Sequence, residues 1–144
     1  MQTYIGTKII KAEPMTRGAY NKLRGWAVPS DENPDDEGFL VEYLDGGKAN
    51  VQGFNGYVSW SPKAVFEQAY VCVGNVEGLQ PHQQRVAAEY SQLCDRVTKL
   101  NSFILTSPHF PALPEAEQAR LERQRQHMSD YAAVLLERIT AFSQ

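Results

Sequence analysis

The sequence has few of the residues that mark covalent or metal chemistry. It contains two cysteines, Cys72 and Cys94, and three histidines in 144 residues. The cysteines fit neither a CxxC pair nor a zinc-ligand spacing, and no Cys/His signature surrounds them, so we interpret them as reduced thiols in a reducing compartment. No P-loop, dinucleotide-binding, nucleophile-elbow or zinc-protease motif is present, and no carboxylate dyad is supported. We therefore expect no cofactor, no metal and no enzymatic activity.

Long apolar segments and a strong net charge are also missing. No stretch approaches the roughly 18 apolar residues that a membrane span needs, and the opening MQTY lacks the charged and apolar regions of a secretory signal. The net charge is -3; residues 1–80 carry seven cationic and ten anionic side chains, and residues 81–144 carry seven of each. We expect a cytoplasmic protein without affinity for membranes or duplex nucleic acid, in which any anion site is a local cluster of basic groups.

The first half of the chain alternates short strand patterns with turn residues. Aromatic and β-branched residues favour strands at residues 4–11, 39–43 and 57–60, and we expect the last two to pair in antiparallel fashion. Residues 28–38 contain two prolines and five carboxylates. Because they lack the ligand order of an EF-hand loop, we interpret them as an exposed acidic loop rather than a cation site.

Two short helices are expected between these strands. Thr16 is a suitable N-cap for a helix that Gly25 would end. Ser61 and Pro62 are expected to start a second helix that runs to about Tyr70, with the Ser61 side chain as the cap.

The second half reads as two long helices. Pro81 opens the first, a Thr-Ser-Pro-His-Phe-Pro segment at residues 106–111 breaks it, and Pro114 starts the second. Apolar residues recur every three or four positions, which predicts one buried stripe on each helix. In the first helix the stripe is Val86, Tyr90, Leu93, Val97, Leu100 and Ile104. In the second it is Leu121, Gln124, Met128, Tyr131, Leu135 and Phe142, with Arg138 on the same stripe and Ile139 beside it.

These patterns predict an α+β protein in two parts. We expect a small antiparallel β-sheet module with short helices at residues 1–72, a linker at residues 73–80, and an antiparallel two-helix hairpin at residues 81–144. Two helices with one stripe each cannot bury a full core. The hairpin is therefore expected to form a homo-oligomer.

Basic and aromatic side chains of the hairpin suggest an anion site. A guanidinium at Arg138 needs a carboxylate, a carbonyl or a bound anion if it lies on the buried stripe, and arginine binds phosphate in bidentate fashion. Tyr90 has two interpretations, a core residue or a platform on which a nucleobase stacks. Thr106 and Ser107 would offer hydroxyls and backbone N–H groups to a phosphate.

The C-terminal stretch resembles a known family. The segments that carry the resemblance are HQQRVAAEYSQLCDRVTKLNSFI, LPEAEQARLERQ and MSDYAAVLLERI, about 60 residues in all. They are similar to the phage anti-CBASS cyclic-nucleotide sponge family, whose members are small helical proteins that form hexamers. Such sponges capture cyclic dinucleotides, and at separate symmetric sites cyclic trinucleotides, without cleaving them.

The resemblance implies a phage-encoded protein that acts in the host cytoplasm and inhibits CBASS signalling, as a hexamer. It places the stacking tyrosine of the family at Tyr90, polar groups at Thr106 and Ser107, and a trinucleotide-site arginine at Arg138. A lysine is expected near the end of the same helix, but Leu105 stands there and Lys99 lies more than a turn earlier. The expected ligand-binding residues are Tyr90, Ser91, Lys99, Thr106, Ser107 and Arg138.

The N-terminal module resembles a small module of tailed-phage proteins with no assigned activity, through segments such as TYIGTKIIKAEPMTRGAYNKLRGW and GYVSWSPKAVFEQAY. This module leaves two alternative functions of the protein open. One is a structural or protein-binding accessory factor, with Trp26, Trp60 and Tyr57 as candidate anchors. The other is a sponge for a cyclic ADP-ribose signal in which this module contributes a pocket.

Overall fold

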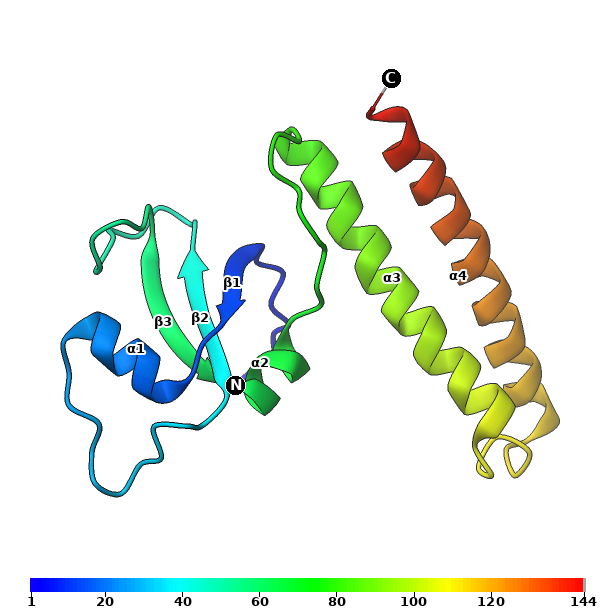
Figure 1. Cartoon of the computed structure of the whole chain (residues 1–144). Helices are drawn as coiled ribbons and strands as arrows, with labels where there is room; N and C mark the ends of the chain where they lie inside the picture. Colours follow the sequence, from blue (N-terminus) through cyan, green and yellow to red (C-terminus); the bar gives the residue numbers. More distant parts are fainter. Residues whose placement is uncertain (144) are drawn as a thin grey trace. The chain divides into compact units, whose positions relative to one another are not determined.

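The computed structural model describes residues 1–143. The chain forms two compact units, the first spanning Met1–Tyr70 and the second beginning at Val71 (Figure 1). The first unit contains β1 (Ile10–Pro14), α1 (Arg17–Arg24), β2 (Gly38–Tyr43), β3 (Tyr57–Pro62) and α2 (Lys63–Ala69), and the second contains α3 (Pro81–Thr106) and α4 (Glu115–Ala141). The expected α+β class, a small antiparallel sheet followed by a long helical hairpin, is confirmed.

The sheet of the first unit is antiparallel throughout, in the order β1-β2-β3. On β2, Leu40 packs in a core cluster with Tyr20 of α1 and Val58 of β3. Its neighbour Phe39 stacks on Phe66 of α2, with ring centroids 4.1 Å apart. Because successive residues of a strand point to opposite faces, α1 and α2 cover opposite faces of the sheet.

The expected helix signals of α1 are confirmed. The Thr16 hydroxyl accepts a hydrogen bond from the Ala19 N–H at 3.2 Å, and Gly25 ends the helix at a φ of 69°. A positive φ of this kind is strained for a residue that has a Cβ, which is why glycine suits the position.

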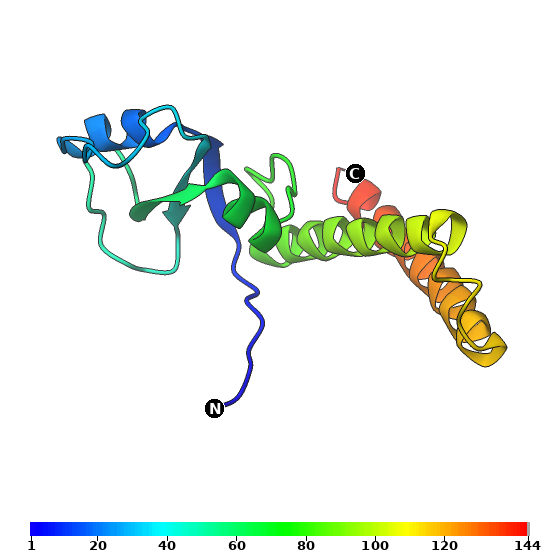
Figure 2. The same ribbon diagram turned by 90° about the horizontal axis from the view of Figure 1, so that it is seen from below.

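Two predicted features of the first unit are wrong in part. The strand expected at residues 4–11 begins only at Ile10, because Ile10 pairs with Tyr43, the last residue of β2, and nothing continues the ladder beyond it (Figure 2). Ser61 does not cap α2. It lies in β3 opposite Phe39, Pro62 takes the cap position, and no side chain makes a capping hydrogen bond there.

The second unit is an antiparallel hairpin, with α3 and α4 side by side in Figure 1 and crossing at an angle in the view of Figure 2. Gln80 and Gln83 form a capping box at the start of α3. Val86, Leu93 and Leu135 form the buried centre. The residues that pack around them are Tyr90, Val97, Met128, Ala132, Ile139 and Phe142.

The predicted stripe of α3 is confirmed at Val86, Tyr90, Leu93 and Val97. The predicted stripe of α4 is confirmed at Met128, Leu135 and Phe142 and is wrong at its other polar and aromatic positions. Ala132 and Ile139 face the core, whereas Gln124, Tyr131 and Arg138 are exposed. Each of these three lies seven residues from the next, so they share a flank beside the buried stripe. Arg138 therefore does not occupy a buried position, and its guanidinium has no desolvation cost to offset. Of the helices in the described residues, none has the length and apolar character that crossing a bilayer requires.

Candidate functional site

Tyr90 lies in the half of the hairpin where α3 begins and α4 ends, called here the open end. It is half-buried and packs against the hairpin core. A hydrogen bond with the Cys94 thiol, four residues along the same helix, is the largest cause that raises the pKa of the Tyr90 phenol. The ring is thus held by α3 and by the core, and part of it remains exposed. Next to it, Ser91 is also half-buried.

Lys99 lies about two turns before the end of α3 and is exposed. Its Nζ donates to the Asp95 carboxylate at 2.7 Å, one turn earlier on the helix. Such an exposed pair contributes little to stability and opens at little cost. Lys99 can bind an anion only if its ion pair with Asp95 opens.

Thr106 and Ser107 lie at the opposite end of the hairpin, the tip formed by residues 107–114. The Thr106 hydroxyl donates to the Ser102 carbonyl at 2.7 Å. The Ser107 N–H bonds the Phe103 carbonyl at 3.2 Å, and the Ser107 hydroxyl accepts from the His109 N–H at 3.2 Å. These groups shape the tip: Phe103 and Phe110 pack edge to face beside them, with centroids 6.0 Å apart.

Arg138 is exposed in the last turns of α4, on the flank that also carries Tyr131. Its positive charge works to lower the pKa of the Tyr131 phenol, against larger effects that raise it. Within residues 1–143 Arg138 forms no salt bridge, in contrast to Arg120, which pairs with Glu117, and Arg125, which pairs with Glu122. Its guanidinium can therefore bind an anion without first losing a carboxylate partner.

The structure separates five of the six expected residues into two groups within one chain, and Lys99 lies between the groups on α3. Tyr90, Ser91 and Arg138 belong to the open end, because Tyr131 of α4 contacts Glu89 of α3 and Arg138 follows Tyr131 by two turns. Thr106 and Ser107 belong to the tip. Sixteen residues of helix separate Tyr90 from Thr106, or about 24 Å along the axis at 1.5 Å per residue. One small ligand cannot contact both groups of the same chain.

Sequence reasoning missed two features of the structure. Tyr131 was assigned to the buried stripe, but its phenol instead reaches across to Glu89 on α3. In the first unit, Trp26 and Trp60 line a common hollow together with Arg17 and Glu32. No sequence motif marks this hollow, since its residues come from three separate segments. In the part of the chain that the structure describes, no three side chains of His, Cys, Asp or Glu gather as a metal site.

The fold thus defines a two-helix hairpin protein with an additional α+β unit. Residues 80–141 match the model of a protein family named Sequestin. The match covers α3, the tip and α4 and does not extend into the first unit. No curated protein and no solved structure matches the chain.

Proposed function

We propose that this protein sequesters a cyclic oligonucleotide immune signal, a cyclic dinucleotide, a cyclic trinucleotide or both, through a homo-oligomer of its helical hairpin. It does not cleave the ligand. It would be a phage protein that withholds the signal of CBASS immunity in the host cytoplasm. One observation carries the proposal. Residues 80–141 match a family whose name denotes sequestration, and the same residues form the complete hairpin α3–α4.

The exposed apolar groups of the hairpin support association with further copies. Leu135 is the single side chain of the described hairpin that is fully buried, so the core is small. Other large apolar side chains remain exposed: Leu105 at 74%, Val134 at 50%, Leu136 at 47% and Tyr131 at 45%. Their burial between copies would add the hydrophobic stabilisation that one hairpin lacks.

Association also provides a route to a complete site. Because the open-end group and the tip group lie about 24 Å apart in one chain, a ligand that contacts both must lie between two copies. Two hairpins packed in opposite directions would bring Tyr90 of one copy to Thr106 and Ser107 of the other. The expected hexamer would offer several such clefts, and Arg138 side chains from several copies could surround the phosphates of a cyclic trinucleotide.

The test uses the purified full-length chain and a panel of cyclic dinucleotides, cyclic trinucleotides and cyclic ADP-ribose isomers. A ligand that binds only the folded protein raises the unfolding temperature by mass action. We expect a shift with at least one cyclic di- or trinucleotide, and mass spectrometry should recover that ligand intact after heat release. A shift with cyclic ADP-ribose alone would replace the proposed ligand class. No shift with any compound would favour the accessory-factor alternative.

Two pairs of variants locate the site. Arg138→Ala is compared with Arg123→Ala, because both arginines are exposed on α4. We expect the first to weaken binding of a cyclic trinucleotide by about tenfold or more, the loss of one charge-assisted contact, and the second to change little. Tyr90→Ala should abolish base stacking that Tyr90→Phe retains. Equal effects within either pair would exclude that residue from the site.

Oligomeric state is measured separately by sedimentation at increasing protein concentration. We expect an assembly larger than a monomer, weakened by Val134→Glu, which places a charge on the exposed apolar flank. The control Ser129→Glu changes an exposed position where the hydroxyl bonds only the Arg125 carbonyl. A chain that stays monomeric at high concentration contradicts the shared-cleft arrangement.

A further inference from the structure

The sheet of the first unit has two edge strands, β3 and β1, and they differ. At the β3 edge the Asn50 side chain takes the place of a neighbouring strand. Its amide oxygen accepts from the Val58 N–H at 2.7 Å, and its amide nitrogen donates to the Val58 carbonyl at 2.9 Å. The same strand ends at Pro62, which has no N–H to offer. Little of the β3 edge therefore remains open to a further strand.

The β1 edge is open. The Met15 N–H bonds the Gly38 carbonyl at 2.9 Å, and this bond shows which residues of β1 face β2. Because bonded and non-bonded pairs alternate in an antiparallel ladder, Ile10 and Ala12 direct their N–H and C=O groups away from β2. Within residues 1–143 these outward groups form no hydrogen bond, and β1 lies at the margin of the sheet (Figure 1). Such an edge is a template for another strand.

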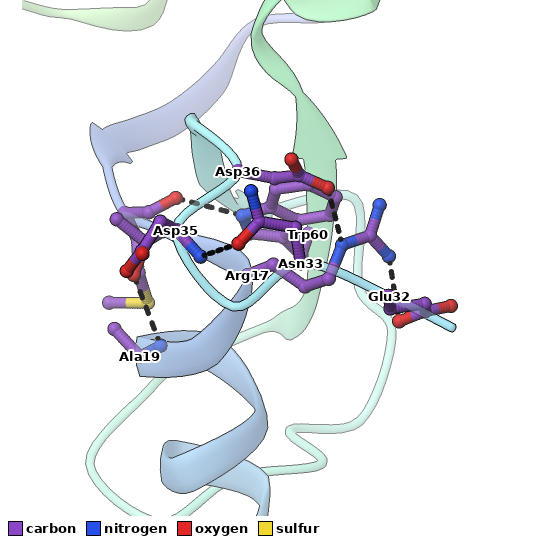
Figure 3. A network of polar contacts seen from close by, with 9 residues as sticks. Arg17, Ala19, Glu32, Asn33, Asp35, Asp36 and Trp60 are labelled. Atoms are coloured by element: carbon purple, nitrogen blue, oxygen red, sulfur yellow. Dashed lines mark hydrogen bonds and ion pairs between the residues drawn. The ribbon is translucent and has the colours of Figure 1, made fainter. Parts of the chain in front are cut away.

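The charged side chains of β1 suit a second copy of the same strand. Figure 3 shows carboxylates of the loop before β2 that are paired within the chain, since Arg17 bridges Glu32 at 2.9 Å and Asp36 at 3.2 Å. Within residues 1–143 the exposed Glu13 carboxylate of β1 has no such ion pair. Lys11, also exposed, lies two positions earlier on the strand and therefore on the same face as Glu13.

These charges also select the register. An antiparallel second copy with Ala12 opposite Ala12 places Lys11 of each copy opposite Glu13 of the other. The neighbouring registers that keep the outward groups in phase place Lys11 opposite Lys11, or Glu13 opposite Glu13. Opposite charges across two strands attract and like charges repel, so the first register is favoured. The Lys11 ammonium has three donors and can bond Glu13 of the second copy in addition to contacts within its own chain.

We infer that β1 pairs with β1 of a second copy about a two-fold axis at Ala12, which joins two three-stranded sheets into one. The Ala12 N–H of each copy donates to the Ala12 carbonyl of the other, and the Ile10 N–H of each donates to the Pro14 carbonyl of the other. A two-fold contact requires a self-complementary patch, and this strand provides one. The inference concerns the first unit alone and does not rest on the function proposed for the hairpin.

Disulfide cross-linking tests the inference in the full-length chain with Cys72→Ser and Cys94→Ser, which removes both native thiols. Residues that exchange hydrogen bonds across antiparallel strands have Cα atoms about 5.5 Å apart, within the range that a disulfide spans. We expect Ala12→Cys to become mostly a covalent dimer on mild oxidation, as seen on a non-reducing denaturing gel. The control Glu13→Cys is equally exposed but lies opposite Lys11, and should remain mostly monomeric. Equal cross-linking of the two variants, or none with Ala12→Cys, overturns the inference.

Charge variants of the Ala12→Cys chain test the register. Glu13→Lys turns two attractive pairs into two repulsive ones and should slow cross-linking by about tenfold. Addition of Lys11→Glu reverses both charges, so each glutamate again lies opposite a lysine and the rate should recover. Tryptophan fluorescence checks that the first unit stays folded in each variant. A double variant that cross-links as slowly as the Glu13→Lys variant would rule out this pairing of β1.

Discussion

The Tyr131 phenol on α4 donates a hydrogen bond to the Glu89 carboxylate on α3. This bond is the largest of the causes that raise the pKa of Tyr131, followed by burial and by the Glu89 charge. It ties the open end of the hairpin together between two side chains that are otherwise exposed. It joins residues 42 positions apart in the sequence and adds a polar contact to the apolar core between the two helices.

The first prediction concerns the titration of Tyr131. A raised folded-state pKa means that the bond stabilises the hairpin fully below the ordinary tyrosine value of 10.0, and that this stabilisation is lost as pH rises through the folded pKa. Glu89→Gln should lower the pKa of Tyr131 toward 10.0, as measured by NMR of the tyrosine rings, with Tyr131→Phe to assign the signal. An unchanged titration in Glu89→Ala, which removes the acceptor as well as the charge, would mean that the bond does not form in solution.

The second prediction compares two neighbouring leucines of α4. Leu135 is completely buried, whereas Leu136 is 47% exposed. Leu135→Ala leaves a cavity and should reduce the free energy of unfolding by about 2–5 kcal/mol, and Leu136→Ala should reduce it by less than about 1 kcal/mol. Urea unfolding followed by helical circular dichroism measures both, because α3 and α4 hold most of the helix. Similar losses for the two variants, at a concentration where the chain is monomeric, would place the helix in a different rotation.

The third prediction concerns Glu42 of β2, a buried carboxylate. It accepts backbone hydrogen bonds from Asn55 at 2.7 Å and Gly56 at 3.0 Å, and so closes the loop before β3. Glu42→Ala leaves both donors unpaired and should cost about 2 kcal/mol or more. Urea unfolding monitored by tryptophan fluorescence reports on the first unit. Glu13→Ala, at an exposed position of β1, is the control and should be close to neutral.

The fourth prediction concerns Gly56. A Cβ at this position would overlap the Tyr43 backbone carbonyl, which cannot move without distorting β2, whereas a Cβ at Gly6 meets open space. Gly56→Ala should therefore destabilise the first unit by about 1–3 kcal/mol, as overpacking does, and Gly6→Ala should not. Fluorescence-monitored unfolding distinguishes them. A stable Gly56→Ala variant would show that the Asn55–Gly56 turn is looser than its hydrogen bonds to Glu42 indicate.

Local patterns were sufficient to predict most of the elements. Thr16 and Gly25 bound α1, and Pro81 opens α3, because capping and helix breaking depend on a few adjacent residues. The break predicted at residues 106–111 is correct to one residue, since Thr106 is the last residue of α3. The extent of β1 could not be predicted in the same way. Residues 4–9 have strand composition but find no partner beyond Tyr43, and a strand requires a neighbour.

The candidate site was less predictable than the fold. A spacing of three and four residues fits both Tyr131–Leu135–Arg138 and Ala132–Leu135–Ile139, and the neighbouring helix selects the second set. Arg138 consequently faces outward. The hollow formed by Trp26, Trp60 and Glu32 has no periodic pattern at all, because its residues come from a loop and from separate elements of the sheet unit.

The sequence by itself determined the bounds of α1 and the starts of the two long helices, that these helices form a hairpin, and that a small sheet precedes them. These features depend on interactions between residues close in the chain, which composition and spacing record. The tertiary structure alone decided which flank of α4 is buried, how far apart the expected ligand-binding residues lie, and which side chains line the hollow of the first unit. Those properties depend on contacts between distant segments, and packing fixes them only when the whole unit is assembled.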